Sequence, residues 1–220
     1  MNLAPYLPFW DGLTKEDQDK LSSSAQTRTA TAGEHVHDGR QECTGFLIVT
    51  DGQLRIYSLS ESGREITLYR LLPGNTCLFS ASCIIRNLTF DIMITAEKDT
   101  AFLLIPSDVY KRLMEENVAV SNYTNELMAS RMSEVMWLMD QIMWQSFDKR
   151  LAAFLLEESN LNGSDSIAIT HEAIANHLGS AREVVTRMLR YFQQEGLVSL
   201  SRGVVMLTDK AALQSIHQKH

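Results

Sequence analysis

The sequence predicts an α+β protein: an N-terminal antiparallel β-roll (a double-stranded β-helix), then one long helix, then a small domain of two helices and a β-hairpin. Glycine turns recur every eleven residues, at Gly52, Gly63 and Gly74. From Ser107 the chain runs without Pro or Gly and is rich in helix-forming residues. Two short helical segments and a hairpin follow residue 169. We therefore expect domains at residues 1–107, 108–145 and 146–220.

The β-roll is expected between Thr27 and Pro106. Residues 53–60 (QLRIYSLS) and 64–72 (REITLYRLL) alternate apolar and polar side chains, as half-buried antiparallel strands do. Residues 89–96 (TFDIMITA) and 100–106 (TAFLLIP) supply two further strands. Together these segments predict a compact all-β roll or barrel.

The long helical stretch carries an apolar seam. Met128, Val135 and Ile142 are seven residues apart, and Met132 and Met139 interleave with them. A seam this narrow is typical of a two-helix coiled coil, so we expect a dimerisation helix and a homodimer. The alternative is a helix that packs on its own β-domain.

The two short helices are expected at 170–178 and 181–195, with a turn at Gly179. Thr170 is a plausible N-cap of the first helix. Gly179 accommodates the left-handed backbone that a tight helix–helix turn needs. This order of elements, followed by the hairpin, predicts a winged helix-turn-helix.

The second helix divides into two faces at 100° per residue. One face is apolar, with Val184, Val185, Met188, Leu189 and Phe192. The other carries Arg182, Glu183, Thr186, Arg187 and Arg190. Arginine pairs with guanine O6 and N7, and glutamate accepts from cytosine N4, so this face suits the reading of double-stranded DNA.

The hairpin and the charge distribution are compatible with DNA binding. Arg202, at the hairpin tip, is expected to touch phosphate as part of a wing. The net charge is −7, but residues 146–220 hold eight basic and eight acidic side chains, so the excess of acid lies in the first two thirds.

The polar face of the second helix also has an interpretation that involves no DNA. In it, Glu183 forms a capping box with Ser180 and an i, i+4 ion pair with Arg187.

The pattern from Thr170 to Leu189, T-x-x-x-I-A-x-x-L-G-x-x-R-E-x-V-T-R-x-L, resembles the helix-turn-helix of the superfamily of bacterial regulators that includes the cyclic-AMP receptor protein and the fumarate–nitrate reduction regulator. G-E-x-V (33–36), F-x-I-x-x-x-G (46–52) and S-x-x-G-R-E (60–65) look like that family's β-roll. The resemblance implies a dimeric transcription regulator, not an enzyme, with RNA polymerase as a partner if it activates. It also implies that Arg182, Glu183 and Arg187 read bases.

One position departs from the family pattern. Ala181 stands before the Arg-Glu pair, where relatives usually carry a hydroxyl residue. We expect Ser180 to take over as helix cap and phosphate contact, which leaves the register on the half-site open.

The signal sensed by the β-roll is expected not to be a cyclic nucleotide. Relatives that bind one carry a Gly-Glu pair for the ribose and an Arg-Ser or Arg-Thr pair for the phosphate. Here Leu78-Phe79 and Phe90-Asp91 stand at those places, and an unpaired buried phosphate costs several kcal/mol. Arg86 is the one nearby cation in the sequence. Another small molecule or a redox signal is expected instead.

The cysteines suggest a redox signal. Cys77 and Cys83 are close enough in sequence for a disulfide, and Cys43 offers a third thiol. No cysteine precedes Cys43, so the iron–sulfur site of the family's oxygen-sensing branch does not carry over. An iron–sulfur cluster or another metal is therefore unsupported, and the alternative is that the thiols are small apolar core residues.

A metal-dependent β-barrel of the cupin type, or an enzyme built on one, is the rival interpretation. Its ligands would be His35, His37, Glu42 and Cys77. Against it, the glycines of the cupin motif are missing, and both imidazoles flank Val36, which faces the core, so we expect them to face solvent. We expect no metal.

No apolar run is long enough for a membrane span, and the N-terminus lacks a basic start and an apolar signal core. We therefore expect a cytoplasmic protein with reduced cysteines and no membrane partner.

Overall fold

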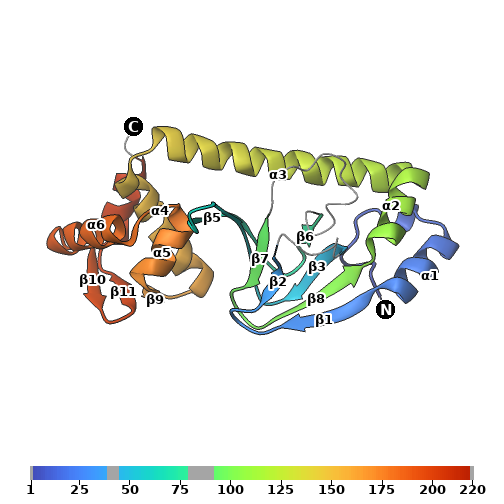
Figure 1. Ribbon diagram of the computed structural model, residues 1–220, viewed down its shortest axis with the longest axis horizontal. Helices are drawn as coiled ribbons and strands as arrows, with labels where there is room; N and C mark the ends of the chain where they lie inside the picture. The colour runs from blue at the N-terminus through green and yellow to red at the C-terminus, as the bar shows by residue number, and fades with distance from the viewer. Residues whose placement is uncertain (1, 39–44, 79–91, 219–220) are drawn as a thin grey trace. The chain divides into compact units, whose positions relative to one another are not determined.

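The computed structural model describes residues 2–38, 45–78 and 92–218 (Figure 1). The chain forms two compact units, Met1–Leu59 with Leu68–Val135, and Ser60–Thr67 with Met136–His220. The helices are η1 (Trp10–Gly12), α1 (Lys15–Ser24), α2 (Ser107–Glu116), α3 (Val118–Trp144), α4 (Phe147–Asn162), α5 (His171–Leu178), α6 (Arg182–Gln194) and α7 (Lys210–Gln218). The strands are β1 (Gln26–Ala30), β2 (His35–His37), β3 (Phe46–Asp51), β4 (Leu54–Leu59), β5 (Glu65–Leu71), β6 (Thr76–Cys77), β7 (Met93–Ala96), β8 (Thr100–Ile105), β9 (Ser166–Ala168), β10 (Val198–Ser201) and β11 (Val204–Leu207).

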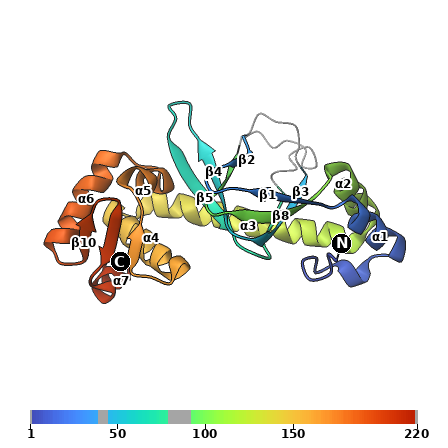
Figure 2. The same cartoon turned by 90° about the horizontal axis from the view of Figure 1, so that it is seen from below.

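Two four-stranded sheets form the predicted β-roll. Their strand orders are β1-β8-β3-β6 and β2-β7-β4-β5. β8 lies antiparallel to both β1 and β3, and β7 lies antiparallel to both β2 and β4. Strands β4 and β5 lie side by side as a hairpin (Figure 2). Strands β4, β5, β7 and β8 lie within the four segments in which strands were expected.

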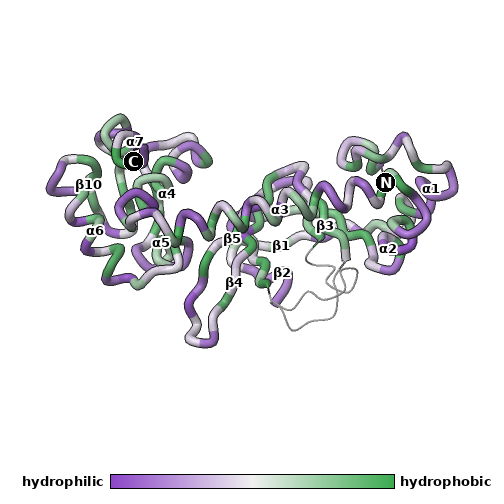
Figure 3. Tube along the Cα trace, turned by 90° about the horizontal axis from the view of Figure 1, so that it is seen from above, coloured by the Kyte–Doolittle hydropathy of each residue, from purple (hydrophilic) through white to green (hydrophobic). Residues whose placement is uncertain are grey.

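Strand β3 is buried on both faces, and it joins the two cores of the N-terminal unit. Its apolar run is drawn in green in Figure 3. Leu47 and Val49 lie in the core between the sheets, whereas Phe46 and Ile48 pack with the N-terminal segment and helices α1, α2 and α3. Successive side chains of a strand point to opposite faces, so a continuous apolar run suits this position.

The long helix expected over 108–145 is divided into two helices, α2 and α3. Asn117 has extended backbone angles, and its Oδ1 accepts from the amides of Ala119 and Val120 at 2.9 and 3.3 Å. An asparagine that caps amides in this way ends one helix and begins the next. A second break follows Trp144, where the long helix was expected to end, and α4 begins after Ser146. The break at Asn117 involves neither Pro nor Gly, so the expectation that one helix runs through this position was wrong.

The expectation that both imidazoles of β2 face solvent was wrong for His37. His35 is exposed, with its Nδ1 2.9 Å from Thr95 Oγ1, whereas His37 is only 5% exposed. The register between β2 and β7 shifts between these two residues. A bulge breaks the two-residue alternation on which the expectation depended.

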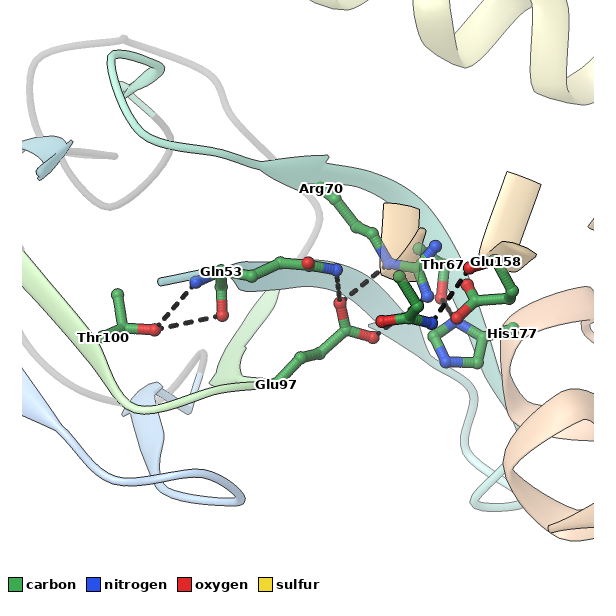
Figure 4. Close-up of polar contacts among 8 residues, drawn as sticks. Gln53, Thr67, Arg70, Glu97, Thr100, Glu158 and His177 are labelled. Carbon is green, nitrogen blue, oxygen red and sulfur yellow. Dashed lines mark hydrogen bonds and ion pairs between the residues drawn. The ribbon is translucent and has the colours of Figure 1, made fainter. Parts of the chain in front are cut away.

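A polar network ties the loops at one end of the roll (Figure 4). Glu97 accepts from Gln53 Nε2 and from Arg70 Nε, each at 2.7 Å. Thr100 Oγ1 accepts from the Gln53 amide at 3.0 Å. Gly52, beside this network, has φ +83°, and a Cβ there would meet Asp99 O and, at 2.7 Å, Thr100 Cα.

We expect Gly52→Ala to destabilise the β-roll more than Gly74→Ala. Both glycines have positive φ, but a Cβ at Gly74 meets nothing within 4 Å. The left-handed backbone alone costs about 1–2 kcal/mol at either position. The backbone collision at Gly52 adds about 1–3 kcal/mol. Thermal unfolding of the two variants measures the difference, and equal melting temperatures would contradict the assigned contact.

Candidate nucleic-acid interface

Helix α6 is held in place by its apolar face. Val185, Leu189 and Phe192 are completely buried in a core built with α4, α5, α7 and the three-stranded sheet β10-β11-β9. Burying three large side chains of one helix stabilises the domain by several kcal/mol, at about 1.5–3 kcal/mol each. The rotation of α6 about its own axis is therefore set by packing.

Helix α5 and the turn after it agree with the sequence. Thr170 Oγ1 accepts from the Ala173 amide at 3.1 Å, which is the expected N-cap. Gly179 has φ +63°, and its amide and that of Ser180 both donate to Ala175 O. Ala175 is buried where α5 and α6 meet. Arg150 Nη1, from α4, donates to Leu178 O at 3.1 Å and so satisfies the C-terminal end of α5.

The opposite face of α6 is polar and basic. Arg182, Glu183, Arg187 and Arg190 are exposed, and Thr186 is half-buried. Together they line a hollow of about 650 Å³, whose residues are Arg182, Glu183, Thr186, Arg187, Arg190, Tyr191 and Gln194. The structure thus brings the predicted residues of this helix to one surface, and it adds Tyr191 and Gln194.

The local alternative for this helix is not formed. The N-cap of α6 is Ala181, without a side-chain cap hydrogen bond, so Ser180 neither caps the helix nor forms a capping box with Glu183. Ser180 precedes the N-cap position by one residue, and its amide donates to Ala175 O in the turn after α5. The expectation that Ser180 replaces the missing cap was wrong. No ion pair joins Glu183 to Arg187, both of which are described residues.

His171 is a residue that sequence reasoning missed. Its Nδ1 lies 2.9 Å from the Oγ1 of Thr186. The pKa of His171 is lowered from its ordinary value, chiefly by partial burial and then by the charges of Arg182 and Arg190. His171 and Thr186 are on different helices and fifteen residues apart, so no periodic pattern in the sequence links them.

The predicted wing is a β-hairpin. β10 pairs antiparallel with β11, from Val198↔Leu207 to Ser201↔Val204, and Arg202 and Gly203 form its exposed tip. β9 adds a third strand on the far side of β11, which the sequence analysis did not anticipate.

Helix α3 exposes three residues of the expected seam, Met132, Met139 and Ile142, but not Met128 and Val135. Met128 packs against the cores of its own β-roll, and Val135 is half-buried. The exposed apolar residues Met132, Met136, Met139 and Met143 instead follow one another at intervals of four, three and four. Ile142 is exposed beside them. One face of α3 therefore packs on the β-roll of the same chain, as the alternative interpretation expected. The methionines lie on a face of α3 that is not covered.

Helix α3 brings a cation to the β-roll that the sequence analysis overlooked. The guanidinium of Arg131, from α3, lies 4.5 Å from the centre of the Tyr69 ring, and its Nη2 donates to Thr76 O at 3.3 Å. It also forms an ion pair with Glu134 at 2.7 Å. Helix packing thus brings a residue from far along the chain to Tyr69 and Thr76. Arg86, the cation that the sequence analysis considered, lies outside the described residues.

Of the three cysteines, the structure describes Cys77. It is 1% exposed, in the core between the sheets, with its Sγ 4.0 Å from the Tyr69 hydroxyl. Burial is the main cause that raises the pKa of Tyr69, and Cys77 adds to it. Cys43, Cys83, Arg86, Glu42, Phe79, Phe90 and Asp91 lie outside the described residues.

Within residues 2–38, 45–78 and 92–218, no group of three or more His, Cys, Asp or Glu side chains is arranged to hold a metal ion. Of the helices in the same ranges, none combines the length and hydrophobicity that a bilayer span requires.

Comparisons with known proteins agree with both parts of the chain. Residues 27–117 match the family model described as cyclic nucleotide-binding domain, and residues 149–216 match the Crp-like helix-turn-helix domain. A solved structure of a Crp/Fnr-family regulator from Eubacterium rectale is 52% identical, with a TM-score of 0.95 over 97% of this chain and 99% of that one.

Two characterised relatives are more distant. The cyclic AMP receptor protein of Thermus thermophilus is 26% identical over 95% of this chain and 96% of its own length. The transcriptional activator protein anr of Pseudomonas aeruginosa is also 26% identical, over 96% of this chain and 88% of its own length.

Proposed function

Since the chain belongs to the Crp/Fnr family of DNA-binding transcription regulators, which are not enzymes, we propose that it reads a two-fold symmetric DNA site as a homodimer. The observation that carries this proposal is the division of α6 into a buried apolar face and an exposed face with three arginines and a glutamate. If the protein activates transcription, RNA polymerase is a further partner.

Three residues of α6 are assigned to base reading. Arg182 and Arg187 are exposed and suit bidentate pairing with guanine, and Glu183 suits cytosine N4. The carboxylate of Glu183 is not engaged in a capping box at the start of α6.

Contacts to phosphate are assigned outside the exposed face of α6. Arg202 is exposed at the tip of the hairpin. The Thr170 hydroxyl accepts from an amide, so its hydrogen is available for a phosphate oxygen. Ser180 lies in the turn before α6, and its hydroxyl does not cap that helix. Phosphate contacts set the register of the protein on DNA, whereas base contacts determine sequence preference.

Selection from a random DNA pool, followed by affinity measurements at several salt concentrations, tests the proposal. Arg187→Ala is expected to cost about 1–3 kcal/mol on the selected site and to relax the preference at one G·C pair. The control, Arg202→Ala, is expected to weaken all sequences alike and to lower the salt slope by about one. A wild-type protein that selects no sequence would contradict the proposal. A uniform loss in Arg187→Ala would make Arg187 a phosphate contact.

The dimer is proposed to form through α3 by way of Met132, Met136, Met139, Ile142 and Met143. The four methionines are spaced by four, three and four residues, which is the spacing of a coiled-coil seam, and Ile142 lies beside them. Such a dimer would place the half-sites on DNA about 34–36 Å apart, or a multiple of that distance. Met128 and Val135 are not included in the proposed seam. Met128 packs against the core of its own chain, and Val135 is half-buried.

We expect light scattering at micromolar concentration to give a dimer. The double variant Met136→Glu, Met139→Glu is expected to dissociate, because two carboxylates in a seam stay unpaired and desolvated. Ser133→Glu, another exposed position of α3 outside the seam, is the matched control and is expected to stay dimeric. A monomeric wild type, or an unchanged double variant, would argue against this interface.

We also propose that the signal is not a cyclic nucleotide. Although residues 27–117 match a cyclic nucleotide-binding domain, the positions expected to bind ribose and phosphate read Leu78-Phe79 and Phe90-Asp91. Arg131 does not substitute as a phosphate ligand, because Glu134 already neutralises it and Tyr69 covers it.

Calorimetry with cyclic AMP and cyclic GMP at millimolar concentration is expected to show no saturable heat. The Thermus relative, named as a cyclic AMP receptor, is the positive control. A saturable isotherm for this chain would overturn the assignment.

The redox signal stays a prediction, since Cys83 and Cys43 lie outside the described residues. The position of Cys77 does not favour it: a thiol buried among apolar side chains is usually inert.

A further inference from the structure

We propose that His171 is a positioning residue for DNA reading, whose protonation state decides whether the Thr186 hydroxyl offers a base an acceptor or a donor. The inference rests on the proposed function and deepens it, because it adds a specificity-determining residue from α5 to the reading surface of α6.

The geometry places the pair at the edge of the reading surface. Thr186 lines the same hollow as Arg182, Glu183 and Arg187. It is half-buried, whereas those three are exposed, and its Oγ1 is 2.9 Å from His171 Nδ1. His171 is the first residue of α5, so its ring reaches α6 from the neighbouring helix.

A threonine hydroxyl has one hydrogen and two acceptor lone pairs. When Nδ1 of neutral His171 accepts that hydrogen, Thr186 has only lone pairs left for a base. It then suits the amino groups of adenine N6 or cytosine N4. When His171 is protonated, Nδ1 must donate, and the hydroxyl hydrogen is released. Thr186 then suits guanine O6 or N7, or thymine O4.

The charges around His171 favour the neutral ring in the protein without DNA. Arg182 and Arg190 act on it from α6, and Glu172 is its neighbour on α5. Partial burial and the two guanidinium groups lower its pKa, so the ring is neutral at pH 7 and becomes protonated as the pH falls through that lowered value. Phosphates that approach Arg182 and Arg190 screen their charge, which shifts the ring back toward protonation.

The test measures the affinity of the dimer for all four base pairs at each half-site position, at pH 8 and at pH 5.5, with folding checked by circular dichroism. In the wild type, we expect one position to change its preference between the two pH values by about two- to tenfold, the range for one hydrogen bond. His171→Asn keeps a hydrogen-bonding group near Nδ1 without a titration, so the preference at that position should not change with pH. His171→Phe and Thr186→Val should each abolish the preference there, and the double variant should lose no more than either alone.

The control is Glu172→Gln, which alters charge beside His171 without touching the pair. It should shift the affinity for all sequences alike and leave the pH-dependent position intact. The ¹⁵N chemical shifts of the His171 ring report directly whether Nδ1 is an acceptor at pH 8.

Other outcomes separate the two proposals. A wild type that binds no preferred sequence overturns the proposed function itself. A wild type that selects a site with no pH-dependent position, or an Nδ1 that carries the hydrogen at pH 8, overturns the role of His171 alone. A uniform loss in His171→Phe, with the salt slope lowered by about one, makes His171 a phosphate contact and also overturns its positioning role.

Discussion

The proposed reading surface, which is the exposed face of α6, depends on the burial of Val185, Leu189 and Phe192 in the C-terminal core. Because these side chains occupy one face of α6, turning the helix by one residue would bury an arginine and expose a phenylalanine. Unpaired buried charge costs several kcal/mol. The orientation of Arg182, Glu183 and Arg187 therefore follows from two effects, the packing of the apolar face and the cost of burying the charged one. The helix needs no side-chain cap to achieve it, which explains how Ala181 is tolerated.

Helix α3 also divides into a face that packs on its own chain and a face that is exposed. Val120, Thr124 and Met128 are used to cover the β-roll, and the tyrosine hydroxyl of Tyr110 is satisfied by Thr124 at 2.9 Å. The methionine stripe that begins at Met132 stays exposed, as do Trp137 and Trp144 of the same helix. A helix with apolar residues on more than one side is expected where it must serve two cores. Methionine adapts to both, since its side chain is flexible and polarizable.

Charge acts locally in this protein. The chain carries a net −7, yet the exposed face of α6 has three arginines against one glutamate. At the β-roll, the charge of Arg131 is paired with Glu134, and its guanidinium also contacts Tyr69 and Thr76. Both arrangements show that the position and partners of a charge, rather than the total, determine what it binds.

The sequence by itself determined the succession of β-roll, long helix and winged helix-turn-helix, the Gly179 turn, the Thr170 cap and the two faces of α6. These features depend on residues within a few positions of one another, where helical and strand periodicity sets the geometry. Only the tertiary structure revealed the pairing of His171 with Thr186, the approach of Arg131 to Tyr69, and the break at Asn117, as well as the burial of His37 by a bulge and the shift of the α3 stripe away from Met128. Periodicity in the sequence indicates which side of a helix or strand is apolar, but it gives no distance between elements. When one helix carries two apolar stripes, the sequence alone does not tell which of them packs on the β-roll and which stays exposed.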